Sequence, residues 1–305
     1  MMAETKIEWA DYTFNPWMGC TKVSPACAHC YAERDFDHRY GKVKWGPSGT
    51  RVLTSDANWK KPIKWNREAE KAGTRPRVFC ASLADVFEDW DGHILDSKGE
   101  VVWNECANET LNMQDVRNRL FDLIDATPHL DWLLLTKRPE NIGRMWPATP
   151  CDGRVCDASV KSRVFCHHDS CDVADGIRQG FRKNVWLGCS VECSDYLHRI
   201  DSLKAAGGLA RFLFLSMEPV VGPMPTLGEY MDGIDWVIAG GESGPKARPS
   251  HVDWFRSIRD QCAFLEVPML FKQWGEHDAE GNRVGKAIAG RMLDGRFHDE
   301  FPCSI

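Results

Sequence analysis

Short apolar runs recur along the second two thirds of the chain, and each gives way to polar residues. Each run is rich in β-branched, aromatic or leucine side chains and nearly continuous in its apolar character. Strands buried on both faces of a parallel sheet show this pattern. A weaker seventh strand is expected before Cys20. The six predicted strands span 77–83, 131–136, 184–190, 211–216, 234–240 and 268–273.

Amphipathic stretches lie between these runs, at 111–126, 194–206 and 251–266. In the first of them, apolar residues at helical spacing form one face. Strands that alternate with helices predict right-handed crossovers and a parallel sheet. The pattern therefore predicts an α/β fold with a partial or complete (β/α) barrel, in a single domain spanning 1–305. The apolar face of the first helix comprises Leu111, Val116, Leu120, Leu123 and Ile124.

Polar residues follow every predicted strand. The carboxyl ends of barrel strands meet at one face, so these residues predict a shared pocket. Any one of them could instead be a helix cap or a structural ion pair, but six strand ends in succession favour the pocket. The residues are Ser82, Asp85, Lys137, Arg138, Ser190, Glu192, Glu218, Gly240, Gly241, Glu242, Lys272 and Gln273.

Three cysteines precede this series in the pattern C-x6-C-x2-C, which Tyr31 follows. Three thiolates can hold three irons of a 4Fe-4S cluster and leave the fourth iron open to another ligand. A structural zinc site and a redox dithiol are the alternatives. Because the chain contains no second C-x2-C pair, the iron-sulfur site is favoured over both. The cysteines are Cys20, Cys27 and Cys30.

Composition indicates what kind of protein carries this site and where in the cell it is found. The chain has 305 residues, 43% of them hydrophobic and 27% charged. No apolar run approaches the ~18 residues that a membrane span needs. The first residues show neither the basic region nor the apolar region of a signal peptide, so a cytoplasmic location is expected. In that compartment the 13 cysteines are expected to be reduced thiols, metal ligands or buried packing residues. The net charge of -6 does not by itself favour nucleic acid.

The segment 42–67 reverses that charge balance, since its only acidic residue is Asp56. Basic residues interleaved with tryptophans can contact phosphates and stack on unpaired bases. A solvated helix face with the tryptophans packed beneath it explains the same pattern equally well. The residues concerned are Lys42, Lys44, Arg51, Lys60, Lys61, Lys64 and Arg67, with Trp45, Trp59 and Trp65.

A second group of cysteines lies in the insertion 150–172, where two C-x4-C pairs flank a stretch that includes His167 and His168. Four thiolates close to imidazoles can form a zinc site or hold a second iron-sulfur cluster. An insertion loop with free thiols is the alternative. The cysteines are Cys151, Cys156, Cys166 and Cys171.

The cysteine pattern in front of a chain of strand and helix units resembles the radical S-adenosylmethionine (SAM) superfamily. More narrowly, the chain resembles the phage- and bacteria-encoded three-Cys-motif family, whose members are largely uncharacterised. It departs from the superfamily in its x6 spacing, where x3 is usual, and in a Gly-Gly-Glu motif that follows the penultimate strand. The stretches that carry the resemblance are 6–9, 15–16, 20–31, 135–139, 185–188, 240–245 and 271–275.

The resemblance implies specific roles for the residues at the strand ends. Cys20, Cys27 and Cys30 would hold the 4Fe-4S cluster, and SAM would chelate the open iron through its amino and carboxylate groups. Ser82 and Asp85 would bind the SAM amino group. Further contacts with the cofactors would come from Tyr31, Ser190, Gly240, Gly241 and Glu242. The residues that position substrate or SAM would be Lys137, Arg138, Glu192, Glu218, Lys272 and Gln273. Of these, the catalytic candidates are Lys137, Glu192, Glu218 and Lys272.

The activity implied is that of an enzyme that cleaves SAM to a 5′-deoxyadenosyl radical, which abstracts hydrogen from a substrate. The basic, Trp-bearing segment favours DNA, RNA or a nucleotide as that substrate, in modification or repair. A flavodoxin- or ferredoxin-type electron donor is expected, and an accessory protein is a further candidate partner. The alternative is a zinc-binding, non-catalytic nucleic-acid-binding protein. A hydrolase is less favoured, because the sequence has neither H-E-x-x-H nor G-x-S-x-G.

Overall fold

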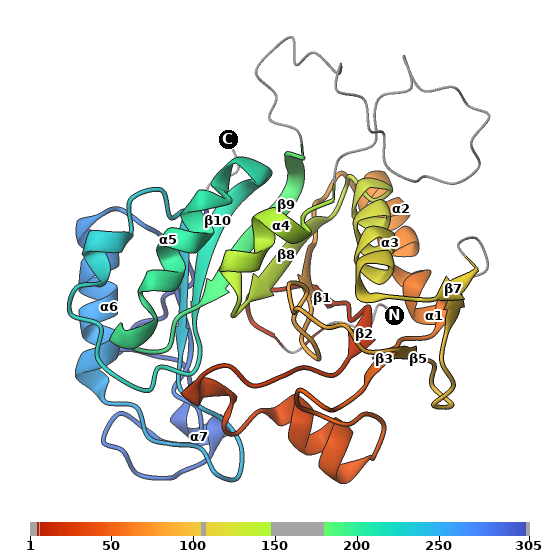
Figure 1. The fold of residues 1–305 in the computed structure, drawn as a ribbon. Helices are drawn as coiled ribbons and strands as arrows, with labels where there is room; N and C mark the ends of the chain where they lie inside the picture. The colour runs from red at the N-terminus through yellow and green to blue at the C-terminus, as the bar shows by residue number, and fades with distance from the viewer. Residues whose placement is uncertain (1–4, 6, 105–107, 148–179, 303–305) are drawn as a thin grey trace.

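The structure is a computed structural model that describes residues 5, 7–104, 108–147 and 180–302. Its centre is a parallel sheet of seven strands in the order β1-β4-β8-β9-β10-β11-β12. The sheet curls into a half-barrel, with β1 and β12 as its two edges (Figure 1). This confirms the partial-barrel form of the predicted fold.

The six predicted strands are all present, and the predicted run 131–136 coincides with β8. The weaker seventh strand that was expected before Cys20 is β1, which has only two residues, and both pair with β4. The strands of the half-barrel are β1 (Tyr12–Thr13), β4 (Arg77–Cys80), β8 (Asp131–Thr136), β9 (Arg182–Ser190), β10 (Ala210–Met217), β11 (Trp236–Gly240) and β12 (Met269–Gln273).

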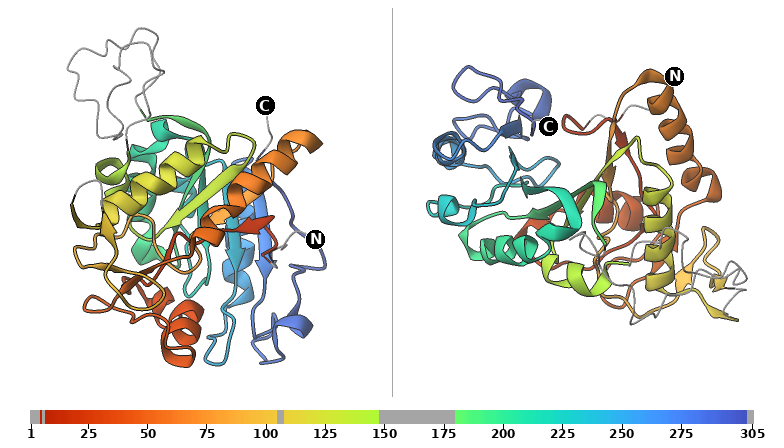
Figure 2. Two further views of the ribbon diagram at one scale, coloured as in Figure 1. Left: turned by 90° about the vertical axis from the view of Figure 1, so that its right-hand side faces the viewer. Right: turned by 90° about the horizontal axis from the view of Figure 1, so that it is seen from above.

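Helices cover the outer face of the sheet (Figures 1 and 2). Asn112 begins α3 with a capping box that includes Asp115, so the helix starts after Leu111 rather than at it. The helices are α1 (Asp56–Trp59), α2 (Lys61–Ala72), α3 (Met113–Asp125), α4 (Ile142–Met145), α5 (His198–Ala205), α6 (Val252–Phe264) and α7 (Lys286–Ala289).

Successive residues of each strand enter different cores, which explains the continuous apolar runs. In β8, Trp132 and Leu134 belong to the large core between sheet and helices, whereas Leu133 belongs to a smaller core inside the half-barrel. Side chains of a strand alternate between faces, so a strand with two buried faces must be apolar throughout. The inner core contains Trp9, Phe79, Trp186, Phe214, Trp236, Ile238 and Leu270.

Gly188 shows how tightly this interior is filled. A Cβ at this position in β9 would collide with the ring of Phe214 on the neighbouring strand β10. The missing side chain leaves room for the phenylalanine ring, which is fully buried. The aromatic inner core therefore closes the interior of the half-barrel beneath its strand ends.

Two tryptophans of the predicted basic segment pack into the large core between sheet and helices, whereas its lysines are exposed. Trp59 and Trp65 are buried, and Trp65 stacks on Tyr12 with ring centroids 4.3 Å apart. Arg51 is fully buried in an ion pair with Glu88. The expectation that these three residues contact bases and phosphates is therefore wrong, and the helix with tryptophans packed beneath it is what the structure contains.

Two small sheets complete the fold. β2 (Trp17–Met18), β3 (Arg51–Leu53) and β5 (Ile94–Leu95) form one, and β6 (Trp103–Asn104) pairs with β7 (Glu109–Thr110). The segment that carries the three cysteines lies at the carboxyl ends of the barrel strands, red at the bottom of Figure 1. Within the described ranges, no helix has the length and apolar character that a membrane span requires.

Candidate functional site

A cavity of about 520 Å³ opens where the cysteine segment meets the carboxyl ends of the strands. It collects most of the residues that the sequence singled out at six successive strand ends and in the cysteine cluster. Among its lining residues are Cys20, Cys27, Cys30, Tyr31, Ser82, Asp85, Lys137, Arg138, Ser190, Glu218, Gly241, Glu242, Lys272 and Gln273.

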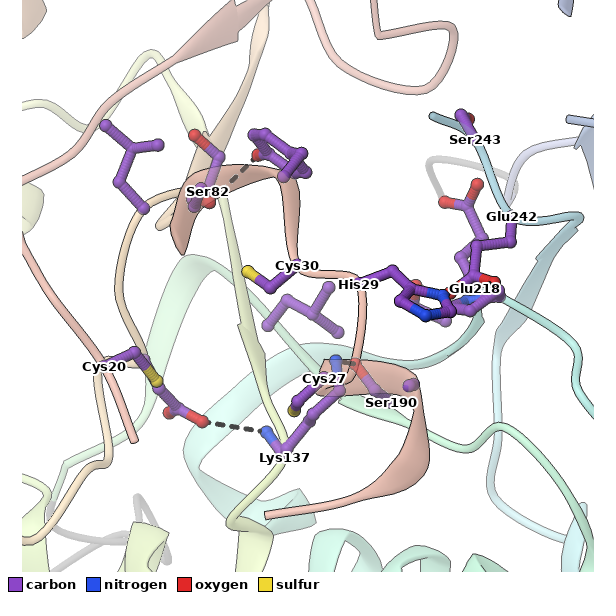
Figure 3. A pocket seen from close by; sticks show the side chains of 18 of the residues that line it. Cys20, Cys27, His29, Cys30, Ser82, Lys137, Ser190, Glu218, Glu242 and Ser243 are labelled. Carbon is purple, nitrogen blue, oxygen red and sulfur yellow. Dashed lines mark hydrogen bonds and ion pairs between the residues drawn. The ribbon is translucent and has the colours of Figure 1, made fainter. Parts of the chain in front are cut away.

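The three cysteines reach this cavity from two segments. Cys20 follows β2, whereas Cys27 and Cys30 lie on the loop that leads into a short π-helix, Glu33–Arg39. All three thiols are free and partly buried. In Figure 3 their sulfur atoms point toward the space between the two segments.

The three thiols are a donor set that an iron-sulfur cluster can use. In such a cluster each thiolate binds its own iron, so the sulfurs surround a shared space. Three free thiols that line one cavity meet this requirement.

The environment of Cys20 is both buried and charged. Burial, together with the carboxylates of Glu88 and Asp85, raises the pKa of the Cys20 thiol to about 12, against the opposing effect of Arg138. Burial also raises the pKa of Cys30. Both thiols are therefore protonated at neutral pH in the metal-free protein, and iron binding would have to displace their protons.

Asp85 connects the ends of two neighbouring strands. Its Oδ1 accepts hydrogen bonds from the Thr136 hydroxyl at 2.6 Å and the Phe87 amide at 3.0 Å. Its Oδ2 accepts from the Lys137 amide at 3.0 Å and from Arg138 at 2.9 Å. A carboxylate has about four acceptor positions, and protein donors take all four of them here.

Two of the lysines that line the cavity, Lys137 and Lys272, differ in whether a carboxylate pairs with them. Lys272 pairs with Glu218, whose two oxygens lie 2.9 and 3.2 Å from Nζ. Lys137 donates to the Ser190 hydroxyl at 3.1 Å. Of the lysines and arginines that line the cavity, Lys137 is the one without an ion pair to a described carboxylate.

Glu242 ties the cysteine loop to the far side of the half-barrel. Arg248 donates to both of its oxygens, at 2.7 and 2.8 Å, and His29 lies 3.3 Å from Oε2 (Figure 3). Burial raises the pKa of Glu242, but the hydrogen bonds from Arg248 and His29 outweigh it and keep the pKa below its ordinary value.

Tyr31, two residues after His29, holds the same loop to the segment that follows β4. Its hydroxyl donates to the Ser82 carbonyl at 2.9 Å. Asn15 in turn donates to the Ser82 hydroxyl at 3.0 Å and accepts from the Leu83 amide at 2.8 Å. The loop that carries Cys27 and Cys30 is therefore anchored after β4 on one side and after β11 on the other.

Two predicted site residues do not line the cavity. Glu192 is buried in an ion pair with Arg199 at 2.9 Å, and its other oxygen has no partner among the described residues. Gly240 lies behind Glu218, whose Oε1 is 2.7 Å from where a Cβ would be. At Gly241, which does line the cavity, a Cβ would collide with the Trp274 carbonyl. These glycines permit close packing of β11 on its neighbours.

The second group of predicted ligands, Cys151, Cys156, Cys166 and Cys171, lies outside the described residues.

Four residues that shape the site were not predicted from the sequence: His29, Glu88, Arg248 and, as a buried ion-pair partner, Arg51. His29 carried a local signal, because it lies between Cys27 and Cys30. Glu88 carried none, since its partners Arg51 and Arg138 are 37 and 50 residues away in the sequence. Arg248 is only six residues from Glu242, but no motif marked it as a partner.

Comparison with known families gives one assignment. Residues 4–302 match the family described as "Protein of unknown function (DUF5131)". The chain belongs to this family. No curated protein matches the sequence.

Among solved structures, the chain is similar to a mutant spore photoproduct lyase solved with dinucleoside spore photoproduct, at 13% identity and a TM-score of 0.42. The match covers 86% of this chain and 63% of that structure, so the chain spans less than two thirds of the length of its structural relative. Similarity at this level does not establish a shared activity.

Proposed function

We propose that the protein is a radical SAM enzyme in which Cys20, Cys27 and Cys30 hold a 4Fe-4S cluster, with SAM and substrate in the adjoining cavity. One observation carries the proposal: three free thiols from two segments line the same cavity as the polar strand ends of a partial barrel. The donor set suits an iron-sulfur cluster, as argued above.

The cluster, when bound, would supply an electron that cleaves SAM to methionine and a 5′-deoxyadenosyl radical, which takes hydrogen from the substrate. The protein's own part is placement and exclusion of water. Trp9, Phe79 and Leu135 give the cavity an apolar wall; the first two belong to the inner core, and Leu135 packs against it. That wall keeps solvent from a reactive species held above it.

Lys137 is the residue best placed to hold an anionic group of SAM or substrate. Its ammonium has only the neutral Ser190 hydroxyl as a described partner, so its charge is available to a ligand. The other lining lysines and arginines are already paired with carboxylates. Replacement by methionine keeps the side-chain length and removes the charge. We expect Lys137→Met to weaken SAM or substrate binding without loss of iron.

A nucleic acid or nucleotide remains the proposed substrate, on narrower grounds than the whole basic segment. Trp45 lines the cavity, and the exposed Lys42 and Lys44 lie beside it in the sequence. An aromatic ring next to exposed cations suits a base and its phosphate. A flavodoxin- or ferredoxin-type protein is proposed as the electron donor.

Anaerobic reconstitution with iron and sulfide tests the cofactor directly. We expect brown protein with about four irons per chain, and formation of 5′-deoxyadenosine from SAM after reduction. The Cys20→Ala, Cys27→Ala and Cys30→Ala variants should each lose the cluster. Cys193→Ala is the matched control, because Cys193 is a partly buried free thiol that does not line the cavity.

Colourless protein with one zinc per chain would overturn this proposal and favour the nucleic-acid-binding alternative. So would retention of the full cluster after all three cavity cysteines are replaced. A screen of DNA, RNA and nucleotides, scored by consumption of SAM, would then identify the substrate class.

A further inference from the structure

A buried cluster of four charged residues lies directly behind Cys20. It consists of Arg51 from β3, Asp85 and Glu88 after β4, and Arg138 after β8, and each is at most 7% exposed. Arg51 donates twice to Glu88, both times at 2.7 Å. Arg138 bridges the two carboxylates, at 2.9 Å to Asp85 and 3.3 Å to Glu88. The two positive and two negative charges balance, as burial requires.

This four-charge cluster binds every polar atom of Thr21, the residue that follows Cys20. The Thr21 amide donates to Glu88 at 2.8 Å, and its carbonyl accepts from Arg138 at 2.7 Å. Its hydroxyl accepts from Arg51 at 2.9 Å. The position of Cys20 is therefore set by the barrel wall, whatever path the five residues from Lys22 to Ala26 follow.

Arg138 also reaches the sulfur itself, since its Nη1 donates to Cys20 Sγ at 3.7 Å. Its second nitrogen, Nη2, meanwhile binds the Thr21 carbonyl and Glu88. A planar guanidinium makes these contacts at once, whereas the single ammonium of lysine cannot. The same side chain thus places Cys20 and directs a positive N–H group at its sulfur.

We propose, on the basis of the function proposed above, that Arg138 is a positioning residue that holds Cys20 and raises the reduction potential of the cluster bound there. Hydrogen bonds to cluster sulfurs are among the factors that set such potentials. Reduction adds negative charge to the cluster, and a cation directed at one of its thiolates stabilises the reduced form more than the oxidised one. Groups around metal ligands also govern how tightly the metal is held.

The test compares Arg138→Gln and Arg138→Lys with the same two changes at Arg182, in the full chain after anaerobic reconstitution. Arg182 is a matched control: it is 3% exposed, pairs with Asp125 through two nitrogens and donates to two backbone carbonyls. It lies at the start of β9 and does not line the cavity. Midpoint potentials from a redox titration followed by EPR and the rate of iron loss to a chelator are measured.

We expect Arg138→Gln to lower the midpoint potential and to weaken iron retention by about 10–100-fold. Arg138→Lys keeps the positive charge but lacks the two guanidinium nitrogens that bind Cys20 and Thr21 at once. It should therefore lose iron faster than the wild type, while its midpoint potential shifts less than that of Arg138→Gln. Both Arg182 variants should match the wild type in potential. If Arg138→Gln does not fold, the lysine variant still decides, through its rate of iron loss.

An unchanged potential and unchanged iron retention in the Arg138 variants would overturn the inference. Equal shifts in the Arg182 variants would do so too, because they would trace the effect to general loosening of the fold. Failure of the proposed function is distinct, since the wild type would then bind no iron-sulfur cluster at all, and the inference would fall with it.

Discussion

The two segments that supply the cysteines are held in different ways. Cys20 lies against the four-charge cluster, whose side chains are almost completely buried. Cys27 and Cys30 lie on a loop held by His29, which lies between them, and by Tyr31, which follows Cys30 and is 47% exposed. One thiol is thus part of the barrel wall, and the other two lie on a covering segment.

This difference gives a physical meaning to the long interval between Cys20 and Cys27. In a short loop, the backbone between two ligands restricts where each can lie. Here the contacts of Thr21 with the barrel restrict Cys20 directly. The five residues from Lys22 to Ala26 therefore need only span the gap between the barrel wall and Cys27. We expect damage to the two segments to have unequal consequences.

The largest effect is expected at Glu88. Glu88→Gln leaves Arg51 and Arg138 without one of their charged partners in a buried setting. Removal of one member of a buried ion pair costs about 3–5 kcal/mol. We expect a loss of this size in the free energy of unfolding, measured by urea denaturation of the metal-free protein. A loss of unfolding free energy below about 1 kcal/mol would show that the four-charge cluster does not stabilise the barrel wall.

A smaller effect is expected at Glu242, on the side of the cysteine loop. Glu242→Gln weakens the bonds to Arg248 and His29, and hydrogen bonds to charged groups are worth about 1.5–3 kcal/mol. Because Arg248 is partly exposed, the lower end is expected. Urea denaturation at pH 7 measures it, and a cost equal to that of Glu88→Gln would remove the contrast between the two segments.

The pH dependence of stability gives a second test of Glu242. Its pKa in the folded protein is below the ordinary value, so its contribution is fully present above about pH 4.3. That contribution is lost as the pH falls through the folded-state pKa. We expect wild type and Glu242→Gln to differ most at neutral pH and to converge in acid. A constant difference between pH 7 and pH 3 would contradict the assigned cause.

The smallest effect is expected from Tyr31→Phe, which removes only the hydrogen bond to the Ser82 carbonyl. Although the residue is 47% exposed, burial raises the pKa of its hydroxyl to about 12, so the lost hydrogen bond should cost about 1 kcal/mol. Iron retention should fall slightly in reconstituted protein. A loss as large as that of Arg138→Gln would show that the covering loop, and not the barrel wall, dominates cluster binding.

Much of the fold was predictable because burial on two faces leaves a clear mark on a strand. Positions in β8 and β10 alternate between the outer and inner cores, and both cores demand apolar residues. The strand ends were predictable for a related reason, since polar residues follow each run and parallel strands end at a common face. The cavity brings most of them together.

The basic segment was harder to interpret because composition does not reveal what lies across from a residue. Arg51 and Trp65 look like nucleic-acid contacts in the sequence, yet Glu88 and Tyr12 bury them. Trp45 keeps its place at the cavity. Local charge was a poor guide wherever the partner came from another element of the fold.

The sequence by itself determined the strands of the large sheet, the helices α3, α5 and α6, the three thiols and the polar strand ends, because each depends on residues close together in the chain. Only the tertiary structure decided how the thiols are held. His29 and Glu242 are 213 residues apart, and Arg138 and Cys20 are 118 apart. Such contacts depend on how the sheet curls and which strand ends meet, and that geometry is the sum of many weak packing preferences that no short stretch of sequence records.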